Sequence, residues 1–302
     1  MKTGLAISIP YVDPHLLRTF LAVADTGSFS AAAQRLQYTQ SAVSQHIAAL
    51  EADLGTPLFT RRPVAPTPAG ERLRRHAALL LVRLEAARAD VTRAVAPPGR
   101  LVLGLTPLAW AVPVAAALAT VRAGAARLRT RLRVAERDRI VEAVATGEID
   151  LGLVDGFTSP SDPLRLPEPG AGGPRAVGVA ESPAVVAVPR SHPLAGRSTV
   201  DLADLADAYW IDAPEVAPFG RLPVDGLRAG LRYDGADVAV LAGLVAAGHG
   251  LVVLPQPVAT AHPGLVGVAV PRLVHRVELL RLPALTPDEP AERLAAHLSE
   301  GT

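Results

Sequence analysis

A cluster of uncharged polar side chains lies between Thr39 and His46, in the run Thr-Gln-Ser-Ala-Val-Ser-Gln-His. Wound as a helix, residues 40–54 place their large apolar side chains on one face: Val43, Ile47, Leu50 and Leu54. The opposite face carries Gln40, Ser41, Ser44, Gln45 and Ala48, with His46 near its boundary. Hydroxyl and amide groups make the hydrogen bonds that base reading in the DNA major groove requires. The pattern predicts a DNA-reading helix, although an Ala-rich bundle with a merely solvated polar face fits the same spacing.

Two further helices are expected to position this one. Ser28 is a suitable N-cap for a helix over residues 29–36, and Gln37 and Tyr38 provide a turn to Thr39, the next N-cap. Asp13 followed by Pro14 opens an earlier helix, whose inward side is expected to contain Leu16, Leu17, Phe20, Leu21 and Ala24. Three helices in fewer than sixty residues predict a helix-turn-helix domain.

A short hairpin is expected after the helices, over residues 58–67. Prolines stand at both ends of this segment, and Arg61 and Arg62 are adjacent within it. Arginines on such a wing contact DNA phosphates, although a solvated loop with two charges is the simpler alternative. The candidate DNA-binding residues are therefore Ser28, Thr39, Gln40, Ser41, Ser44, Gln45, His46, Arg61 and Arg62.

These residues resemble a known family. Residues 13–76 are similar to the N-terminal domain of LysR-type transcriptional regulators, with matching runs at residues 17–36, 41–59 and 67–70. The resemblance implies a winged helix-turn-helix. Two departures concern the wing, which is about two residues shorter than is usual for the family and carries Pro66 in place of a leucine. They put the wing's phosphate contacts in doubt and leave the fold unaffected.

Composition and charge agree with a DNA-binding head on a larger body. Residues 1–100 hold twelve basic and seven acidic residues, a net charge of +5, whereas the remaining residues hold eighteen and twenty-two, a net charge of −4. The 302 residues include no cysteine, which excludes disulfides, thiolate nucleophiles and thiolate metal sites, and we expect a cytoplasmic protein. Asp13 and Pro14 interrupt the apolar patch in the first twelve residues, and no apolar run is long enough to span a membrane.

A long helix is predicted from Pro68 to about Ala96. Apolar residues recur along it at alternating spacings of four and three, forming a heptad stripe: Leu73, Ala77, Leu80, Leu84, Ala87, Val91 and Ala94. At 1.5 Å per residue the helix is roughly 44 Å long, too long to bury against one small domain. We expect it to pair with a second copy through Leu73, Leu80, Leu84 and Val91; packing on its own domain is the alternative.

From Arg100 onward strands and helices alternate, which predicts an α/β domain. Strands are expected at residues 101–105, 128–134, 149–154, 184–188, 251–254 and 277–282. Helices are expected between them from Thr106 to about Gly124 and near residues 137–145, 200–206 and 237–247, with a last one capped by Thr286 and Pro287. The runs at residues 147–153, 187–195 and 244–255 resemble the effector domain of the same family, which is similar to periplasmic solute-binding proteins.

The expected architecture has three parts. Residues 1–67 form an all-α winged helix-turn-helix, residues 68–97 a linker and dimerisation helix, and residues 98–302 an α/β effector domain of two Rossmann-like subdomains. Subdomain I takes about residues 98–175 and 262–302, and subdomain II about residues 176–261. The end of the chain is thus expected to return to subdomain I.

The resemblance implies an effector near the first helix of that domain and the loops after its strands. The matching positions are Thr106, Pro107 and Leu108; Asp155, Gly156 and Phe157; and Tyr233, Asp234 and Pro255. A helix start at Thr106 would offer free N–H groups to an anion, although Thr106 fits equally as a simple cap.

No pattern supports catalysis or a resident metal or cofactor. The histidines show no metal-ligand spacing, the loop at residues 170–173 lacks a phosphate-binding fingerprint, and no nucleophile elbow occurs. We therefore expect a transcriptional regulator, not an enzyme, that binds a partly palindromic double-stranded DNA site as a dimer or tetramer and responds to a small molecule. RNA polymerase is a further expected partner, and the nucleoid the expected location. A solute-binding protein and an α/β enzyme with a fused interaction domain remain the alternatives.

Overall fold

The computed structural model describes residues 12–95, 99–111, 114–125, 127–167, 173–282 and 290–299. It consists of two compact units, Met1–Arg88 and Ala89–Thr302, so the division falls inside the long helix. Several predicted features lie outside the described residues: the apolar patch over residues 1–11, the linker at residues 96–98, the glycines at positions 170 and 172, and the cap at Thr286 and Pro287.

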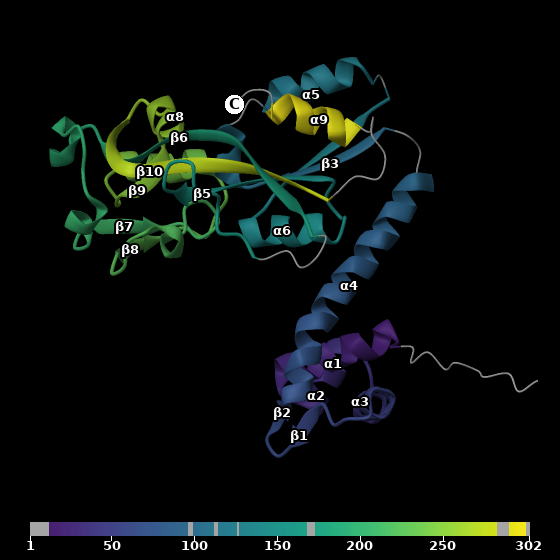
Figure 1. The fold of residues 1–302 in the computed structure, drawn as a ribbon. Helices are drawn as coiled ribbons and strands as arrows, with labels where there is room; N and C mark the ends of the chain where they lie inside the picture. Colours follow the sequence, from purple (N-terminus) through teal and green to yellow (C-terminus); the bar gives the residue numbers. More distant parts are fainter. Residues whose placement is uncertain are drawn as a thin grey trace, which may run out of the picture. The chain divides into compact units, whose positions relative to one another are not determined.

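The first unit begins with three short helices, labelled in Figure 1: α1 (Pro14–Thr26), α2 (Phe29–Leu36) and α3 (Gln40–Leu54). Each starts at the predicted cap. The side chains of Asp13, Ser28 and Thr39 accept hydrogen bonds from backbone N–H groups at 2.8, 3.3 and 3.1 Å. Gln37 follows α2 with a φ of 58°, which forms the tight turn toward α3. The predicted helix-turn-helix is confirmed.

The core of this unit lies between the helices and the hairpin. Phe20, Val43 and Leu50 are fully buried, and the ring of Phe20 lies 5.2 Å from that of Phe59. Leu17 and Phe20 of α1 are buried as expected, together with Val23, which the spacing argument missed. Leu54 was predicted on the buried stripe and is 38% exposed, because it is the last residue of α3 and the chain turns away at Gly55.

The predicted hairpin is also present. Strands β1 (Phe59–Arg61) and β2 (Val64–Pro66) pair antiparallel, and the Thr60 hydroxyl accepts a hydrogen bond from the Ala65 N–H at 3.2 Å. Helix α4 (Pro68–Val95) follows, with Thr67 as its cap: the Thr67 hydroxyl accepts from the Gly70 N–H at 3.1 Å.

The second unit is built on a six-stranded sheet of order β4-β3-β5-β10-β6-β9. Its strands are β3 (Arg100–Leu105), β4 (Arg129–Val134), β5 (Leu151–Thr158), β6 (Arg175–Pro189), β9 (Val252–Pro255) and β10 (Leu265–Arg281). Strands β4, β3 and β5 are parallel, whereas β10 is antiparallel to both β5 and β6. A separate parallel pair is formed by β7 (Tyr209–Asp212) and β8 (Arg228–Arg232), neither of which was predicted.

Helices cover this sheet. They are α5 (Val114–Ala123), α6 (Arg137–Ala145), α7 (Val238–Ala246), α8 (Gln256–Ala261) and α9 (Pro290–Ser299), with 3₁₀ turns η1 (Pro107–Ala111), η2 (Pro193–Gly196), η3 (Leu202–Leu205) and η4 (Phe219–Arg221). Figure 1 shows α5 and α9 side by side on one face of the sheet and α6 on the other. The predicted helices near residues 107 and 200 are only 3₁₀ turns at those positions.

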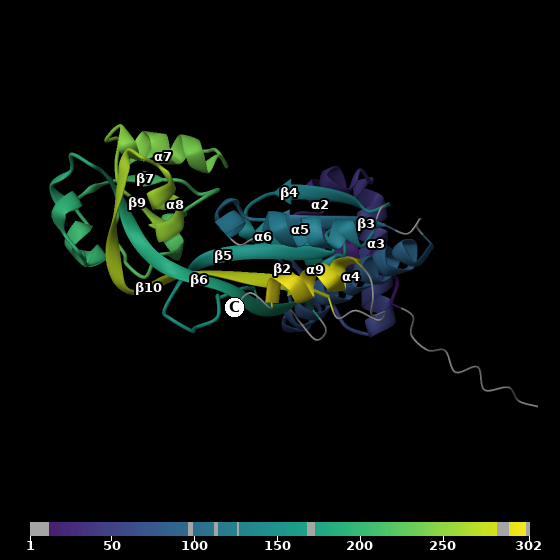
Figure 2. The same ribbon diagram turned by 90° about the horizontal axis from the view of Figure 1, so that it is seen from above.

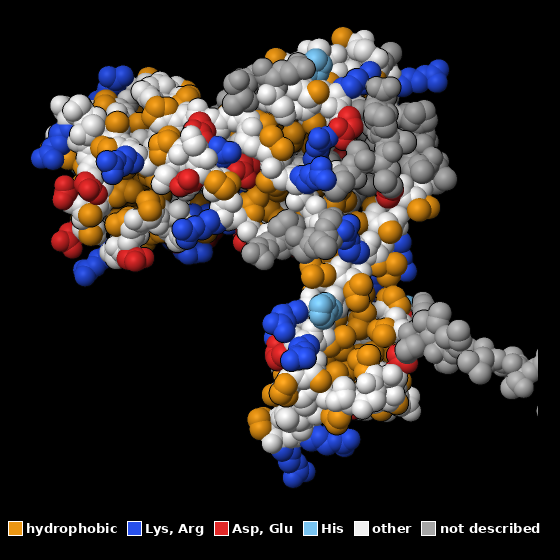
Figure 3. Space-filling view, viewed as in Figure 1, with side chains coloured by type: hydrophobic (Ala, Val, Ile, Leu, Met, Phe, Trp, Pro, Cys, Tyr) orange, Lys and Arg blue, Asp and Glu red, His pale blue; other side chains and the backbone are white. Residues whose placement is uncertain are grey.

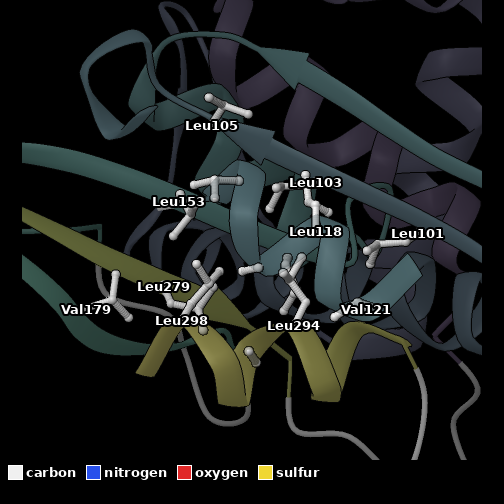
Figure 4. Close-up of a cluster of buried hydrophobic side chains, with 14 of the residues drawn as sticks. Leu101, Leu103, Leu105, Leu118, Val121, Leu153, Val179, Leu279, Leu294 and Leu298 are labelled. Atoms are coloured by element: carbon white, nitrogen blue, oxygen red, sulfur yellow. The ribbon is translucent and has the colours of Figure 1, made fainter. Parts of the chain in front are cut away.

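The first subdomain contains one dense core. Leucines of β3, β5 and β10 pack against Leu118 of α5 and against Leu294 and Leu298 of α9 (Figure 4). The C-terminal helix therefore lies in the same core as the beginning of the second unit.

The second subdomain is joined to the first by two long strands. In Figure 2, β6 and β10 run continuously from the part covered by α5 and α9 to the part covered by α7 and α8. Along β6, Val179 packs in the first core and Val185 in the second, so the expected boundary before residue 176 is wrong: β6 is shared between the subdomains. Alternating hydrophobicity does not reveal this, because both halves of such a strand are equally apolar.

Candidate nucleic-acid interface and ligand pockets

The polar face of α3 is exposed. Gln40, Ser44 and Gln45 are exposed, and their side chains make no hydrogen bond with another described residue. Ser41 is also exposed and shares a 3.0 Å hydrogen bond with the hydroxyl of Thr39. The four side chains present donors and acceptors outward from a helix whose other side is fixed by Val43 and Leu50.

The other predicted contacts of the helical region have structural roles. His46 is half-buried, its Nδ1 lies 3.0 Å from the Thr19 hydroxyl, and its ring meets Tyr38 edge to face. Ser28 is half-buried and caps α2, and Thr39 caps α3. These side chains hold the helices in place; contact with DNA stays a prediction for them.

A groove separates α3 from the hairpin, and one acidic residue that sequence reasoning missed joins the two elements. Gln40, Ser44, Thr60 and Arg61 are among the residues that line the groove. A carboxylate oxygen of Glu51 accepts hydrogen bonds from the N–H groups of Leu58 and Phe59, at 2.7 and 3.3 Å. Its negative charge is thus committed to the hairpin backbone.

The end of the hairpin carries two exposed arginines. Arg61 and Arg62 are exposed, and neither forms an ion pair with another described residue. In Figure 3, basic side chains gather at the lower end of the first unit, where Figure 1 shows the hairpin of β1 and β2. By contrast, Arg35 and Arg74 elsewhere on the unit both pair with Asp25.

The apolar stripe of α4 is divided. Near its start Ala77 is buried, and Leu73 packs against the core of the first unit; Leu73 was predicted on a dimer contact and is instead part of this core. Glu85, further along, pairs with Arg18 of α1. Leu80 is 55% and Val91 67% exposed, and Leu84 is half-buried. The part of the stripe that remains uncovered therefore begins near Leu80.

The Thr106 hydroxyl is hydrogen-bonded within the sheet. The residue is 4% exposed; its hydroxyl accepts a hydrogen bond from the Asp155 N–H at 3.1 Å and donates to the Leu153 carbonyl at 3.4 Å. It bridges the ends of β3 and β5. These bonds give the hydroxyl a structural role, and an effector contact at Thr106 stays a prediction.

The neighbouring predicted residues surround a nearly filled cleft. Asp155, Gly156 and Phe157 line it with Thr106, and its volume is about 20 Å³, room for roughly one water. Asp155 pairs with the buried His275 at 2.9 Å, and Phe157 meets the His275 ring edge to face.

The side chain of Arg137 fills part of this cleft, next to Gly156. A Cβ built at this position would lie 2.8 Å from Nη1 of Arg137, so a larger residue here would displace the guanidinium from its place beside β5. Arg137, which the sequence reasoning did not single out, thus enters the predicted effector cleft.

The remaining predicted effector residues lie elsewhere. Pro107 and Leu108 line a separate apolar groove of about 830 Å³ with Trp110. Tyr233 bonds to the backbone of Asp237, and Asp234 pairs with Arg232. Pro255 is buried at the start of α8. None of these last three predicted residues lines the cleft at Thr106.

A larger cavity of about 800 Å³ opens on the other side of Arg137. Arg137, Phe157 and Arg221 line both this cavity and the small cleft, so they form the wall between them. Of the nine predicted effector positions only Phe157 lines the large cavity. The basic residues at 137 and 221 carried no motif, and only their proximity in the fold brings them together.

The described part of the chain contains no helix suited to crossing a membrane. It likewise contains no group of three or more histidine or acidic side chains arranged to hold a metal ion.

Comparison with known sequences assigns both units. The model of the family described as bacterial regulatory helix-turn-helix protein, LysR family, matches residues 14–71. The model described as LysR substrate binding domain matches residues 95–302.

Two relatives are about equally similar to the chain. A probable hydrogen peroxide-inducible genes activator of Mycobacterium avium is 33% identical over 94% of this chain and 92% of its own. The HTH-type transcriptional regulator BudR of Raoultella terrigena is 33% identical over 80% of this chain and 83% of its own.

Solved structures share the fold. The LysR family regulator CbnR is matched with a TM-score of 0.53 at 22% identity, over 96% of this chain and 99% of CbnR. A full-length mutant of BenM is matched with a TM-score of 0.52 at 23% identity, over 96% of this chain and 95% of BenM.

Proposed function

The chain belongs to the LysR family of DNA-binding transcriptional regulators with a substrate-binding effector domain, and from this premise we propose how its own residues act. Gln40, Ser41, Ser44 and Gln45 read base edges in a major groove, and Arg61 and Arg62 bind the adjacent phosphates. The observation that carries this proposal is the exposed polar face of α3 beside an exposed arginine pair. Gln40, Ser44 and Gln45 on that face make no hydrogen bond to another described residue, and the arginine pair has no acidic partner among the described residues.

The proposed self-association of the chain determines the symmetry of its DNA target. LysR regulators form oligomers, and we propose that this chain binds a partly palindromic site as a dimer or tetramer, each copy contacting one half-site. CbnR, whose fold this chain shares, has been solved with its target DNA. The uncovered stripe of α4 from Leu80 to Val91 supports a helix pair between copies, because exposed apolar residues at heptad spacing are stabilised by burial against a twin.

A second self-contact is proposed at the free edge of the six-stranded sheet. Strand β4 is the outermost strand, and its Leu132 and Val134 are exposed, as is Val240 of the nearby α7. Leu132 and Val134 line the apolar groove together with Trp110. A second copy of this surface covers it in the proposed tetramer, since unpaired strand edges and apolar patches of this kind favour association.

The effector domain is proposed to bind a small molecule, with no resident cofactor. Binding changes the equilibrium between oligomer states only if the ligand prefers one of them.

RNA polymerase is proposed as a further partner at the promoter, with the protein in the cytoplasm on the nucleoid. One relative is named as a hydrogen peroxide-inducible genes activator, but cysteine oxidation is not available to these 302 residues, because they contain no cysteine.

Genome-wide mapping of bound DNA followed by titration tests this function. The purified full chain is expected to bind a fragment recovered from the genome at least about a thousand times more tightly than random DNA of equal length. Equal affinities for the two fragments at several salt concentrations would remove sequence-specific binding from the proposal.

A further inference from the structure

We propose that the 800 Å³ cavity of the effector domain binds a small organic carboxylate with an apolar body, held at its charged end by Arg137 and Arg221. The ligand class deepens the proposed function, and its regulatory effect rests on that function. The binding step itself is independent of DNA.

Burial and a neighbouring cation disfavour the positive charge of Arg137. Burial lowers the pKa of its guanidinium, and the positive charge of Arg221 lowers it further. Its Nε is buried with no hydrogen-bond partner, and one Nη donates a long 3.5 Å bond to the Asp155 carbonyl. Arg221 has a similarly long 3.5 Å ion pair with the exposed Asp138. The carboxylates of Asp138, Asp155 and Glu278 act in the opposite direction but do not cancel the lowering of the Arg137 pKa. An anion between the two guanidinium groups would supply further negative charge and hydrogen-bond acceptors.

The positive charge of a third arginine, Arg276, is balanced by two carboxylates. Arg276 pairs with Glu278 and Glu181, and the hydrogen bond to Glu278 raises its pKa. Glu278 also accepts the N–H of Leu164 at 3.0 Å, which fixes the loop that forms one wall of the cavity. Arg276 is therefore a structural residue, whereas Arg137 and Arg221 retain binding capacity in a wall that is already built.

The size and lining of the cavity define the rest of the ligand. A volume of 800 Å³ lies within the range of roughly 300–1,000 Å³ typical of small-molecule sites. Leu164, Leu202 and Leu273 are buried residues on its walls, and four arginines face two aspartates around it. One of these aspartates, Asp201, caps η3 by accepting the Ala203 N–H. The lining thus suits an anion with an apolar body.

Backbone strain occurs at the rim of the same cavity. Arg272 has a φ of 61° where β10 is interrupted between Ala269 and Val274, and it is exposed without an ion pair to another described residue. A non-glycine residue in this region costs of order 1–3 kcal/mol, and such strain concentrates at functional sites. Arg272 therefore adds a strained, exposed cation to the lining of the cavity.

Calorimetric titration of the full-length chain tests the proposal with four probes: phenylacetate, 4-methylpentanoate, their common neutral control phenylacetamide, and inorganic phosphate. At least one of the two acids is expected to bind saturably at millimolar concentration or below, and both phenylacetamide and phosphate roughly tenfold more weakly or not at all. Failure of both acids to bind, or equal affinity for the amide or phosphate, would overturn the proposal.

Variants locate the site. Arg221→Gln and Arg137→Gln are expected to weaken acid binding roughly tenfold to a hundredfold, whereas Arg139→Gln, two residues from Arg137 and paired with Glu142, retains it. Gly220→Phe should block the cavity that Gly220 lines, and Gly196→Phe serves as its control, since an added Cβ meets nothing within 4 Å at either glycine. Melting temperatures verify that each variant is folded, and Gly220→Phe tests the location even if an arginine variant fails to fold.

The outcomes separate this proposal from the regulator function. Undiminished binding by the folded Arg221→Gln and Gly220→Phe variants would place the acid elsewhere and overturn the assignment. If the wild type binds a genomic DNA fragment specifically but neither acid, the ligand proposal fails and the regulator function stands. If an acid binds with the expected dependence but no specific DNA is found, the regulator function fails alone.

Discussion

Two pairs of arginines in this protein occupy opposite environments. Arg61 and Arg62 lie on an exposed hairpin, where water screens their charge. Arg137 and Arg221 line a cavity, and burial together with their mutual repulsion lowers the pKa of Arg137. The same side-chain chemistry therefore suits two proposed tasks. In the proposed functions, the exposed pair contributes long-range, salt-sensitive attraction to a polyanion, and the enclosed pair selects one small anion.

Each arginine pair depends on the hydrophobic core of its own unit, and disruption of one core is expected to have the largest effect. Phe20→Ala removes a fully buried ring that contacts Phe59, and should destabilise the first unit by about 3–5 kcal/mol. Differential scanning calorimetry is expected to show an earlier transition for that unit and an unchanged one for the second. Specific DNA binding is lost while acid binding persists. A single shifted transition would mean that the two units unfold together.

A substitution that disrupts dimerisation is expected to have the next largest effect. Leu80→Asp places a charge on the uncovered stripe of α4, where the twin helix is expected, and should convert the oligomer to smaller species. Operator affinity should fall roughly 10²–10⁴-fold because the second half-site is no longer bound by the same complex. Ala78→Asp, exposed about 160° around the helix from Leu80, is the matched control. Light scattering that finds an intact oligomer for Leu80→Asp contradicts the pairing.

Thr106→Val separates a structural role from a ligand contact. The change removes the acceptor of the buried Asp155 N–H and should cost the effector domain about 1–3 kcal/mol. Thr106→Ser, which retains the hydroxyl, is expected to recover most of that loss. Denaturant unfolding of the second unit measures both variants. If Thr106→Val were as stable as the wild type but lost acid binding, Thr106 would be a ligand contact after all.

The smallest expected effects distinguish base reading from phosphate binding on the first unit. Gln45→Ala should reduce discrimination between operator and random DNA by about 1–3 kcal/mol, since it removes a base contact. Arg62→Ala, its counterpart on the hairpin, should weaken both complexes equally and lower the salt slope by about one. Anisotropy titrations at several salt concentrations measure both. Equal loss on both DNAs for Gln45→Ala would remove it from base reading.

The first unit was predictable because its signals are local. Asp13, Ser28 and Thr39 cap helices a few residues away, and each of these caps was identified from the sequence. The exceptions were small: Leu54 ends its helix exposed, and Leu73 packs into the core of its own unit. Whether α4 pairs through its uncovered part remains a prediction.

The ligand site of the second unit was far less predictable. Thr106, Asp155 and Gly156 were expected to contact the effector, and they surround a cleft with room for roughly one water. Arg137 and Arg221 are 84 positions apart and belong to no motif, so no spacing argument could join them. Only Phe157 was both expected to contact an effector and found on the large cavity.

The sequence by itself determined the caps, the amphipathic stripes, the winged helix-turn-helix, the alternation of strands and helices, and the absence of thiol chemistry, because composition and neighbours a few residues apart carry that information. The tertiary structure decided that β6 and β10 are shared by both subdomains, that the Thr106 hydroxyl is used within the sheet, and that two cations meet at one cavity wall. The desolvation and charge repulsion that act on these cations depend on residues far apart in the sequence, and only folding brings such residues together.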